Sequence, residues 1–143
     1  MYAKLLNKKE RPKGRDMRKI LIIDDDRQIR KIYLRLLTAE GYGAIEASTA
    51  DDAYGVLIKE KVDLILLDIK MPEIDGSIIY EIIQSFNKKV RVIVTSVYPI
   101  IEQKQIIEGA SDYYDKSQGT DVLLAKVKSA LENETVRKDA SCQ

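Results

Sequence analysis

Short, continuous apolar runs alternate along the chain with segments in which apolar residues recur every three or four positions. The continuous runs are rich in Ile, Val and Leu, which is typical of strands buried on both faces of a parallel sheet. They lie at residues 19–24, 43–47, 62–68, 90–95 and 112–115. The periodic segments are typical of amphipathic helices, and they lie at residues 27–40, 49–59, 77–86, 100–108 and 120–132.

This alternation predicts an α/β fold, a doubly wound parallel sheet of five strands with helices on both faces. Parallel neighbours need crossover connections, and right-handed crossovers place the connecting helices over the sheet. The length of 143 residues suits a single domain of this kind. Residues 18–132 are predicted to form that domain.

Glycine and threonine mark two helix boundaries. Gly41 is predicted to end the first helix and Thr49 to cap the second, because glycine favours the position after a helix and a threonine hydroxyl accepts from first-turn N–H groups. The apolar stripes of the first, third and last helices are predicted to face the core. Their members are Ile29, Ile32, Tyr33, Leu36, Leu37, Ile78, Ile79, Ile82, Ile83, Val122, Leu123, Val127 and Leu131.

Both ends of the chain are polar. In residues 1–17, Lys and Arg outnumber the acidic Glu10 and Asp16, and too few apolar residues recur to offset the entropy of ordering. This segment is predicted to be a basic, disordered leader, with a basic docking arm as the alternative. Residues 133–143 are predicted to be a polar tail.

Composition narrows the function classes. A net charge of +1 gives no general reason to expect direct binding to nucleic acid or membranes, and no apolar run reaches the roughly 18 residues of a membrane span. The single cysteine, Cys142, cannot form an internal disulfide, so a cytoplasmic location is predicted.

The sequence contains no histidine. Catalysis by Ser-His-Asp or Cys-His groups and His-ligated zinc or iron are therefore excluded within this chain. A bound metal would need oxygen ligands, which points to Mg²⁺, Mn²⁺ or Ca²⁺.

Reactive side chains follow four of the predicted strands. Asp24–Asp26 follow the first, Asp68 ends the third, Thr95 ends the fourth and Lys116 follows the fifth. The carboxyl ends of parallel strands share one edge, where ligands of such folds bind. Carboxylates at ~4 Å repel by about 4 kcal/mol per pair at an effective dielectric near 20, so a divalent cation or Lys116 must offset their charge.

Such a group of residues would also accept a phosphoryl group, whose oxygens favour a metal, a cation and hydroxyl donors, and a carboxylate there can act as nucleophile. Each residue has a plainer alternative: Asp24–Asp26 as a helix cap, Asp68 as an N-cap or turn residue, Thr95 as a turn residue, and Lys116 as a solvated side chain. Their joint placement at four strand ends favours the phosphoryl site.

Four motifs, ILIIDDD, LILLDIKMPEIDG, VIVTS and GASDYYDKS, resemble those of the receiver domains of two-component response regulators, the chemotaxis and sporulation regulators among them. The resemblance covers about residues 18–132. It implies a flavodoxin-like, CheY-like (βα)5 fold with strand order 2-1-3-4-5.

The resemblance implies a role for each acidic residue. Asp68 is the expected phosphoacceptor. Asp25 would coordinate Mg²⁺ directly, Asp24 would act largely through water, and the backbone carbonyl of Lys70 would be a further ligand, with Mn²⁺ as an alternative ion.

The resemblance also implies a switch. Thr95 would bond the phosphoryl group, Lys116 would pair with it, and the ring of Tyr113 would turn inward. The surface formed by residues 100–108, 112–115 and 120–132 would then change its affinity for a downstream target, or mediate a homodimer. The phosphoryl donor would be a histidine kinase or a histidine phosphotransfer protein, and the chain would be a signalling domain that catalyses only its own phosphoryl transfer and loss.

Three positions depart from the family pattern. Ser117 replaces a proline after Lys116, so a trans bond and a slightly displaced Lys116 are expected, because a cis bond to serine costs about 2.5–4 kcal/mol. Lys70 and Val97 occupy the positions that tune loss of phosphate, and neither can orient an attacking water, which predicts a long-lived phosphoryl state. Tyr114 competes with Tyr113 for the inward position, although strand alternation favours Tyr113.

Two other functions compete with this interpretation. One is a non-phosphorylated scaffold, or pseudo-receiver, that only binds partners. The other is a haloacid-dehalogenase-type phosphatase with Asp24 as nucleophile, which the Asp24-x-Asp26 spacing resembles, although Gln28 stands where that motif needs Thr or Val.

Overall fold

The computed structural model describes residues 17–72 and 75–141, with side chains as far as residue 132. Its centre is a parallel sheet of the strands β1 (Lys19–Ile23), β2 (Gly43–Ala47), β3 (Leu64–Asp68), β4 (Arg91–Ser96) and β5 (Asp112–Asp115). The strand order is β2-β1-β3-β4-β5, which confirms the predicted doubly wound fold. The predicted leader lies outside the described residues, apart from Met17.

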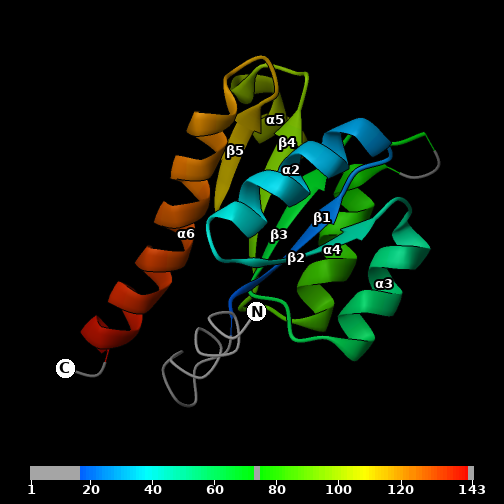
Figure 1. Ribbon diagram of the computed structural model, residues 1–143. Coiled ribbons are helices and arrows are strands. Elements are labelled where there is room, and N and C mark those ends of the chain that lie inside the picture. Colours follow the sequence, from blue (N-terminus) through cyan, green and yellow to red (C-terminus); the bar gives the residue numbers. More distant parts are fainter. Residues whose placement is uncertain (1–16, 73–74, 142–143) are drawn as a thin grey trace, which may run out of the picture.

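Five helices within the described residues cover this sheet. They are α2 (Arg27–Ala39), α3 (Ala50–Lys59), α4 (Gly76–Phe86), α5 (Ile100–Ile106) and α6 (Thr120–Ser141). Helices α2 and α6 pack on one face, and α3, α4 and α5 pack on the other (Figure 1). No helix within the described ranges is both long enough and apolar enough to cross a membrane.

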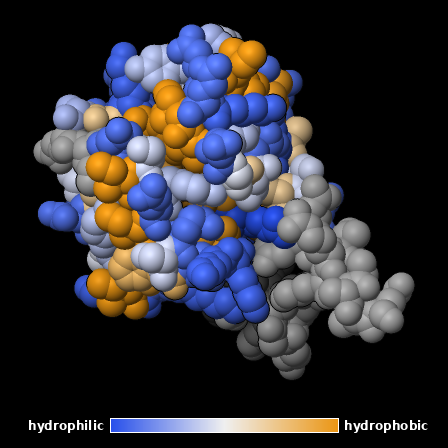
Figure 2. All heavy atoms as spheres, turned by 180° about the vertical axis from the view of Figure 1, so that it is seen from behind, coloured by the Kyte–Doolittle hydropathy of each residue, from blue (hydrophilic) through white to orange (hydrophobic). Residues whose placement is uncertain are grey.

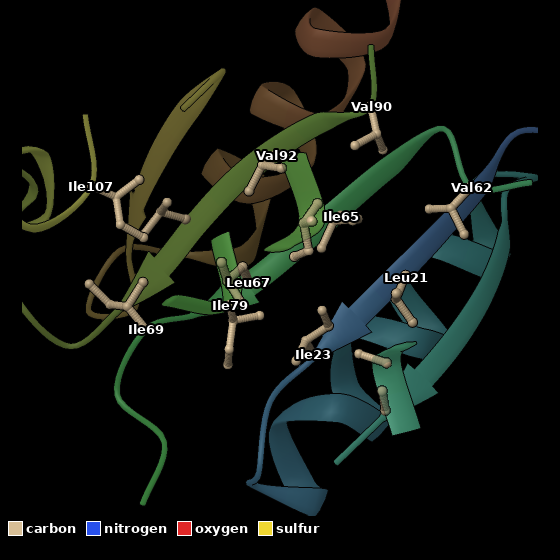
Figure 3. Close-up of a cluster of buried hydrophobic side chains, with 14 of the residues drawn as sticks. Leu21, Ile23, Val62, Ile65, Leu67, Ile69, Ile79, Val90, Val92 and Ile107 are labelled. Carbon is tan, nitrogen blue, oxygen red and sulfur yellow. The ribbon is translucent and has the colours of Figure 1, made fainter. Parts of the chain in front are cut away.

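Successive residues of each strand alternate between two buried clusters. The cluster beneath α3, α4 and α5 contains Leu21, Ile23, Ile65, Leu67 and Val92 of the three central strands (Figure 3). The cluster beneath α2 and α6 contains their alternate neighbours, such as Ile22, Leu66 and Ile93. Both faces of the central strands are therefore dry, which explains their continuous apolar sequences.

Two predicted core residues lie on the surface instead. The side chains of Ile32 in α2 and Ile78 in α4 are each 47% exposed. In each helix, only the middle of the apolar face contacts the sheet, and residues there, such as Tyr33 and Ile79, are buried. Ile32 and Ile78 lie at the edge of that face and stay partly exposed. Figure 2, which shows the face of α3, α4 and α5, has apolar side chains interspersed with hydrophilic ones.

The predicted helix boundaries agree at most ends. Thr49 caps α3, its hydroxyl accepting from the N–H of Asp52 at 3.1 Å, and Gly41 follows α2 with a positive φ of 92°. The last helix differs, because α6 continues to Ser141 where an end near Glu132 was predicted. Residues 133–141 contain neither glycine nor proline, so nothing in this segment interrupts a helix.

Gly76 fixes how closely α4 approaches the loop after β3. A Cβ atom at this position would lie 2.5 Å from the Cα of Ile69, far inside van der Waals contact. Ile69 directly follows Asp68, so the absence of a side chain at Gly76 determines how α4 packs beside the end of β3.

Replacing Gly76 by alanine is expected to destabilise the protein by about 1–3 kcal/mol, because the backbone at Ile69 must move to admit the methyl group. The matched control is Gly55→Ala within α3, where a Cβ would meet no atom within 4 Å. That change should stabilise the protein by roughly 0.5–1 kcal/mol through helix propensity. Chemical denaturation of both variants measures the difference, and equal effects of the two substitutions would contradict this account of Gly76.

Candidate functional site

The candidate site lies where β1, β3 and β4 end. Asp68 is the last residue of β3 and is in register with Thr95 of β4. Asp24 directly follows Ile23, the last residue of β1, which is in register with Leu67. The sheet therefore brings residues from three distant parts of the sequence to one edge.

Three carboxylates gather at this edge. Asp24, Asp25 and Asp68 each present an oxygen within 4.8 Å of the others. Asp24 and Asp68 are only 1% and 4% exposed, whereas Asp25 is open to solvent. Asp26 takes no part, because its side chain caps α2 by accepting from the N–H groups of Gln28 and Ile29. The capping alternative thus holds for Asp26 and leaves its two predecessors available.

Backbone N–H groups fix the two buried carboxylates. One oxygen of Asp24 accepts from the N–H of Asp26 at 2.9 Å, and one oxygen of Asp68 accepts from the N–H of Lys70 at 3.0 Å. The second oxygen of each carboxylate faces the ammonium of Lys116.

Lys116 reaches both buried carboxylates from the loop after β5. Its Nζ lies 2.8 Å from Oδ2 of Asp24 and 3.5 Å from Oδ2 of Asp68. Its backbone N–H donates to the carbonyl of Ser96 at 2.8 Å, which anchors the loop to β4. The bond between Lys116 and Ser117 is trans, as expected from the missing proline.

The environment of Asp68 disfavours its negative charge. Burial and the neighbouring charge of Asp24 raise the pKa of Asp68 to about 6, although Lys116 and the N–H of Lys70 act in the opposite direction. Burial by itself would lower the pKa of Lys116. The hydrogen bond to Asp24 and the negative charges of Asp68 and Asp24 outweigh the effect of burial, so the pKa of Lys116 is raised. Lys116 is therefore an ammonium that only partly offsets the acidic cluster.

The donor set of the cluster fits a hard divalent cation. Three carboxylates and one ammonium leave an excess of negative charge, and every candidate ligand atom is oxygen. Asp25 opens the cluster to solvent, which provides a route of entry. The role of the Lys70 carbonyl as a metal ligand stays a prediction. The structure shows instead a hydrogen bond from the backbone N–H of Lys70 to Oδ1 of Asp68.

The predicted hydroxyl and aromatic residues are both buried. Thr95 is adjacent to Asp68 through the strand register. The hydroxyl of Tyr113 donates to the carbonyl of Ile107 at 2.7 Å, within the cluster beneath α5. Tyr114 is buried too, but on the opposite face, where its hydroxyl donates to the carbonyl of Gln118 at 2.7 Å. Strand alternation thus places Tyr113 on the α5 side and Tyr114 on the other, so both rings are buried, and the switch role of Tyr113 stays a prediction.

The two residues that were predicted to tune loss of the phosphoryl group are exposed. The side chain of Val97 is 62% exposed, and Lys70 is exposed as well. The Nζ of Lys70 lies 5.6 Å from the ring centroid of Tyr98, a cation–π distance.

Sequence reasoning missed Tyr98 and also Gln103, which is fully buried in α5. A signal was present, because Gln103 lies three residues after Ile100 and four before Ile107, on the inward stripe. The neighbouring isoleucines divide between core and surface: Ile107 is buried, whereas Ile101 and Ile106 are exposed.

Comparison with known proteins gives a consistent family assignment. A family model described as "Response regulator receiver domain" matches residues 20–128. Sporulation initiation phosphotransferase F of Bacillus subtilis is 33% identical over 79% of this chain and 93% of its own length. Transcriptional regulatory protein YxdJ of the same organism is 31% identical over 80% of this chain, which spans only 51% of that relative.

Solved structures agree in fold. A CheY-like response regulator receiver domain protein from Methanospirillum hungatei is 28% identical, with a TM-score of 0.79 over 85% of this chain and 99% of that chain. Response regulator protein TrrA from Thermotoga maritima, crystallised in complex with Mg²⁺-BeF, is 31% identical, with a TM-score of 0.73 over 80% of this chain and 100% of that chain. The chain therefore belongs to the response regulator receiver domain family of two-component signalling systems.

Proposed function

We propose that this receiver domain accepts a phosphoryl group on Asp68 from a phosphohistidine, with Mg²⁺ bound, and so changes the surface formed by α5, β5 and α6. The observation that carries the proposal is the convergence of three carboxylates and Lys116 at one end of the sheet. Response regulators as a family act with histidine kinases and downstream effectors. The printed sequence contains no histidine, so the donor group comes from elsewhere.

Asp68 suits the role of nucleophile. Its Oδ1 is held by the Lys70 N–H, which orients the carboxylate at the strand end. In the transfer, a carboxylate oxygen of Asp68 forms a bond to phosphorus while the bond from phosphorus to the imidazole nitrogen breaks. The imidazole leaves with the electron pair, and the product is an acyl phosphate.

Lys116 and Thr95 support the transferred group. The ammonium of Lys116, already 3.5 Å from Asp68, would pair with phosphoryl oxygens, and the Thr95 hydroxyl would donate to one of them. Mg²⁺ held by Asp24, Asp25, Asp68 and the carbonyl of Lys70 would offset the negative charge of the carboxylates and the phosphoryl group. Mn²⁺, with similar oxygen chemistry, would substitute.

The proposed output passes through β4 and β5. Thr95 belongs to β4, and its neighbour Val94 is in register with Tyr113. Movement of Thr95 toward the phosphoryl group would alter the packing of Tyr113 under α5, and hence the affinity of that face for a downstream protein or a second copy of the chain. We place this signalling in the cytoplasm, where histidine kinases present their phosphohistidines.

Replacing Asp68 by asparagine should abolish labelling by a phosphohistidine donor, because an amide is not a nucleophile here. The control is Asp26→Asn, which keeps a good helix cap and leaves the cluster intact. Phosphate-sensitive gel electrophoresis and peptide mapping provide the measurement. Label retained after Asp68→Asn, or mapped to residue 24, would refute the proposal, and the latter would favour the phosphatase alternative.

Mg²⁺ should stabilise the folded protein because the cluster forms only on folding. At a concentration one hundred times its Kd, a single bound ion raises the unfolding free energy by about 2.7 kcal/mol. Asp25→Asn should lose most of this gain, whereas Asp26→Asn should retain it. Thermal denaturation with and without Mg²⁺ measures the effect, and equal stabilisation of the two variants would count against the assigned ligands.

The phosphoryl group should be long-lived, since neither Lys70 nor Val97 can orient a water molecule for attack. Val97→Gln places a carboxamide at the rim and should shorten the lifetime at least about tenfold by positioning that water. Val97→Leu is the matched control and should leave the lifetime unchanged. Decay of the phosphorylated form after removal of the donor gives the rates, and loss within seconds in the unmodified protein would contradict the prediction.

A further inference from the structure

Gln103 makes an unusual set of contacts for a core residue. It is fully buried in α5, and its Nε2 donates to the carbonyl of Tyr98 at 2.8 Å and to that of Tyr114 at 2.9 Å. Its Oε1 is buried without a partner among the described residues. Both amide hydrogens are thus used, while the oxygen has no protein partner among the described residues.

The orientation of this amide follows from its partners. If nitrogen and oxygen were exchanged, the oxygen of Gln103 would face two carbonyl oxygens, and no hydrogen would lie between them. Leucine or methionine would fill a similar volume without burying an unpaired oxygen. Gln103 therefore does more than fill volume, because its amide group hydrogen-bonds two backbone carbonyls and so relates their positions to each other.

Those carbonyls belong to the two segments that support the proposed phosphoryl group. Tyr98 lies three residues after Thr95, and Tyr114 lies two residues before Lys116. The same segments are joined again near the site, where the N–H of Lys116 donates to the carbonyl of Ser96 at 2.8 Å. Gln103 thus ties together the chain segments that carry the hydroxyl and the ammonium.

Tyr98 also connects to the loop after Asp68. The Nζ of Lys70 lies over the ring of Tyr98. The backbone N–H of Tyr98 donates to the hydroxyl of Ser96 at 3.1 Å. The residue whose carbonyl Gln103 holds is therefore linked to the loops after β3 and β4.

We propose that Gln103 is a positioning residue for the phosphoryl site: through the carbonyls of Tyr98 and Tyr114 it sets the distance between the Thr95 hydroxyl and the Lys116 ammonium. This inference rests on the proposed function. It concerns the support of the phosphoryl group in the first place, because Gln103 hydrogen-bonds two backbone carbonyls and would affect the acidic cluster only through Lys116.

The alternative is that Gln103 only anchors α5 to the sheet. In that case, its replacement would lower stability but leave the affinity of the folded protein for a phosphoryl analogue unchanged. Beryllium fluoride serves as that analogue, and Mg²⁺ binding serves as an internal reference for an intact acidic cluster.

The experiment compares Gln103→Met, which is similar in size but has no donor, and Gln103→Glu, which keeps the shape but places an oxygen toward both carbonyls. The control is Gln105→Met, on the exposed side of the same helix. Both Gln103 variants should bind beryllium fluoride between about tenfold and a hundredfold more weakly, the range expected for a misplaced supporting group. Both variants should still bind Mg²⁺, with a smaller change in affinity than for beryllium fluoride, because the three carboxylates stay in place while Lys116 shifts. Gln105→Met should match the unmodified protein in both measurements.

The outcomes separate the two hypotheses. Reduced melting temperature with unchanged beryllium fluoride affinity would overturn the role of Gln103. Failure of the unmodified protein to bind beryllium fluoride with Mg²⁺ would overturn the proposed function instead.

A measurement on the unmodified protein applies even if the variants fail to fold. The side-chain amide signals of Gln103 in a ¹⁵N-resolved NMR spectrum should shift when beryllium fluoride binds, because the carbonyls that they contact move with Thr95 and Lys116. Signals that do not respond would refute the inference.

Discussion

The ion pair between Lys116 and two buried aspartates is the interaction on which this structure depends. Asp24 and Asp68 lie almost fully out of solvent, where like charges repel strongly. Lys116, separated from Asp24 by 92 positions in the sequence, offsets part of that repulsion at 2.8 Å. Asp25 adds a third carboxylate, so the cluster still carries more negative than positive charge. An excess of negative charge of this kind contributes nothing favourable to folding by itself, which is the physical ground for the metal and phosphoryl site proposed here.

The fold can hold such a cluster because the central strands of the sheet are apolar and buried on both faces. Strand alternation divides the aliphatic residues between two cores, and the carboxylates emerge only where the strands end. Close packing of Gly76 against Ile69 sets the approach of α4 to the residue that follows Asp68.

The contacts around Tyr98 give the site a second layer of support. Lys70, Ser96 and Gln103 converge on this residue from the loop after β3, the end of β4 and α5 respectively. Tyr113 and Gln103 each connect β5 to α5 or the residue that ends it, because Tyr113 donates to the carbonyl of Ile107 and Gln103 donates to that of Tyr114. The proposed signal from Asp68 would thus reach α5 through the loop after β4 and through β5.

Local pattern by itself determined the strand–helix alternation, the caps at Thr49 and Gly41, and the presence of acidic, hydroxyl and ammonium groups at strand ends. These features depend on neighbours within a few positions, so periodicity and residue type were sufficient. Only tertiary structure decided that Asp26 caps a helix while Asp24 and Asp25 join Asp68, because three consecutive aspartates look alike until the sheet places them. It likewise decided that Ile32 and Ile78 are exposed and that Gln103 holds two distant carbonyls, since burial and hydrogen-bond partners depend on which elements pack together.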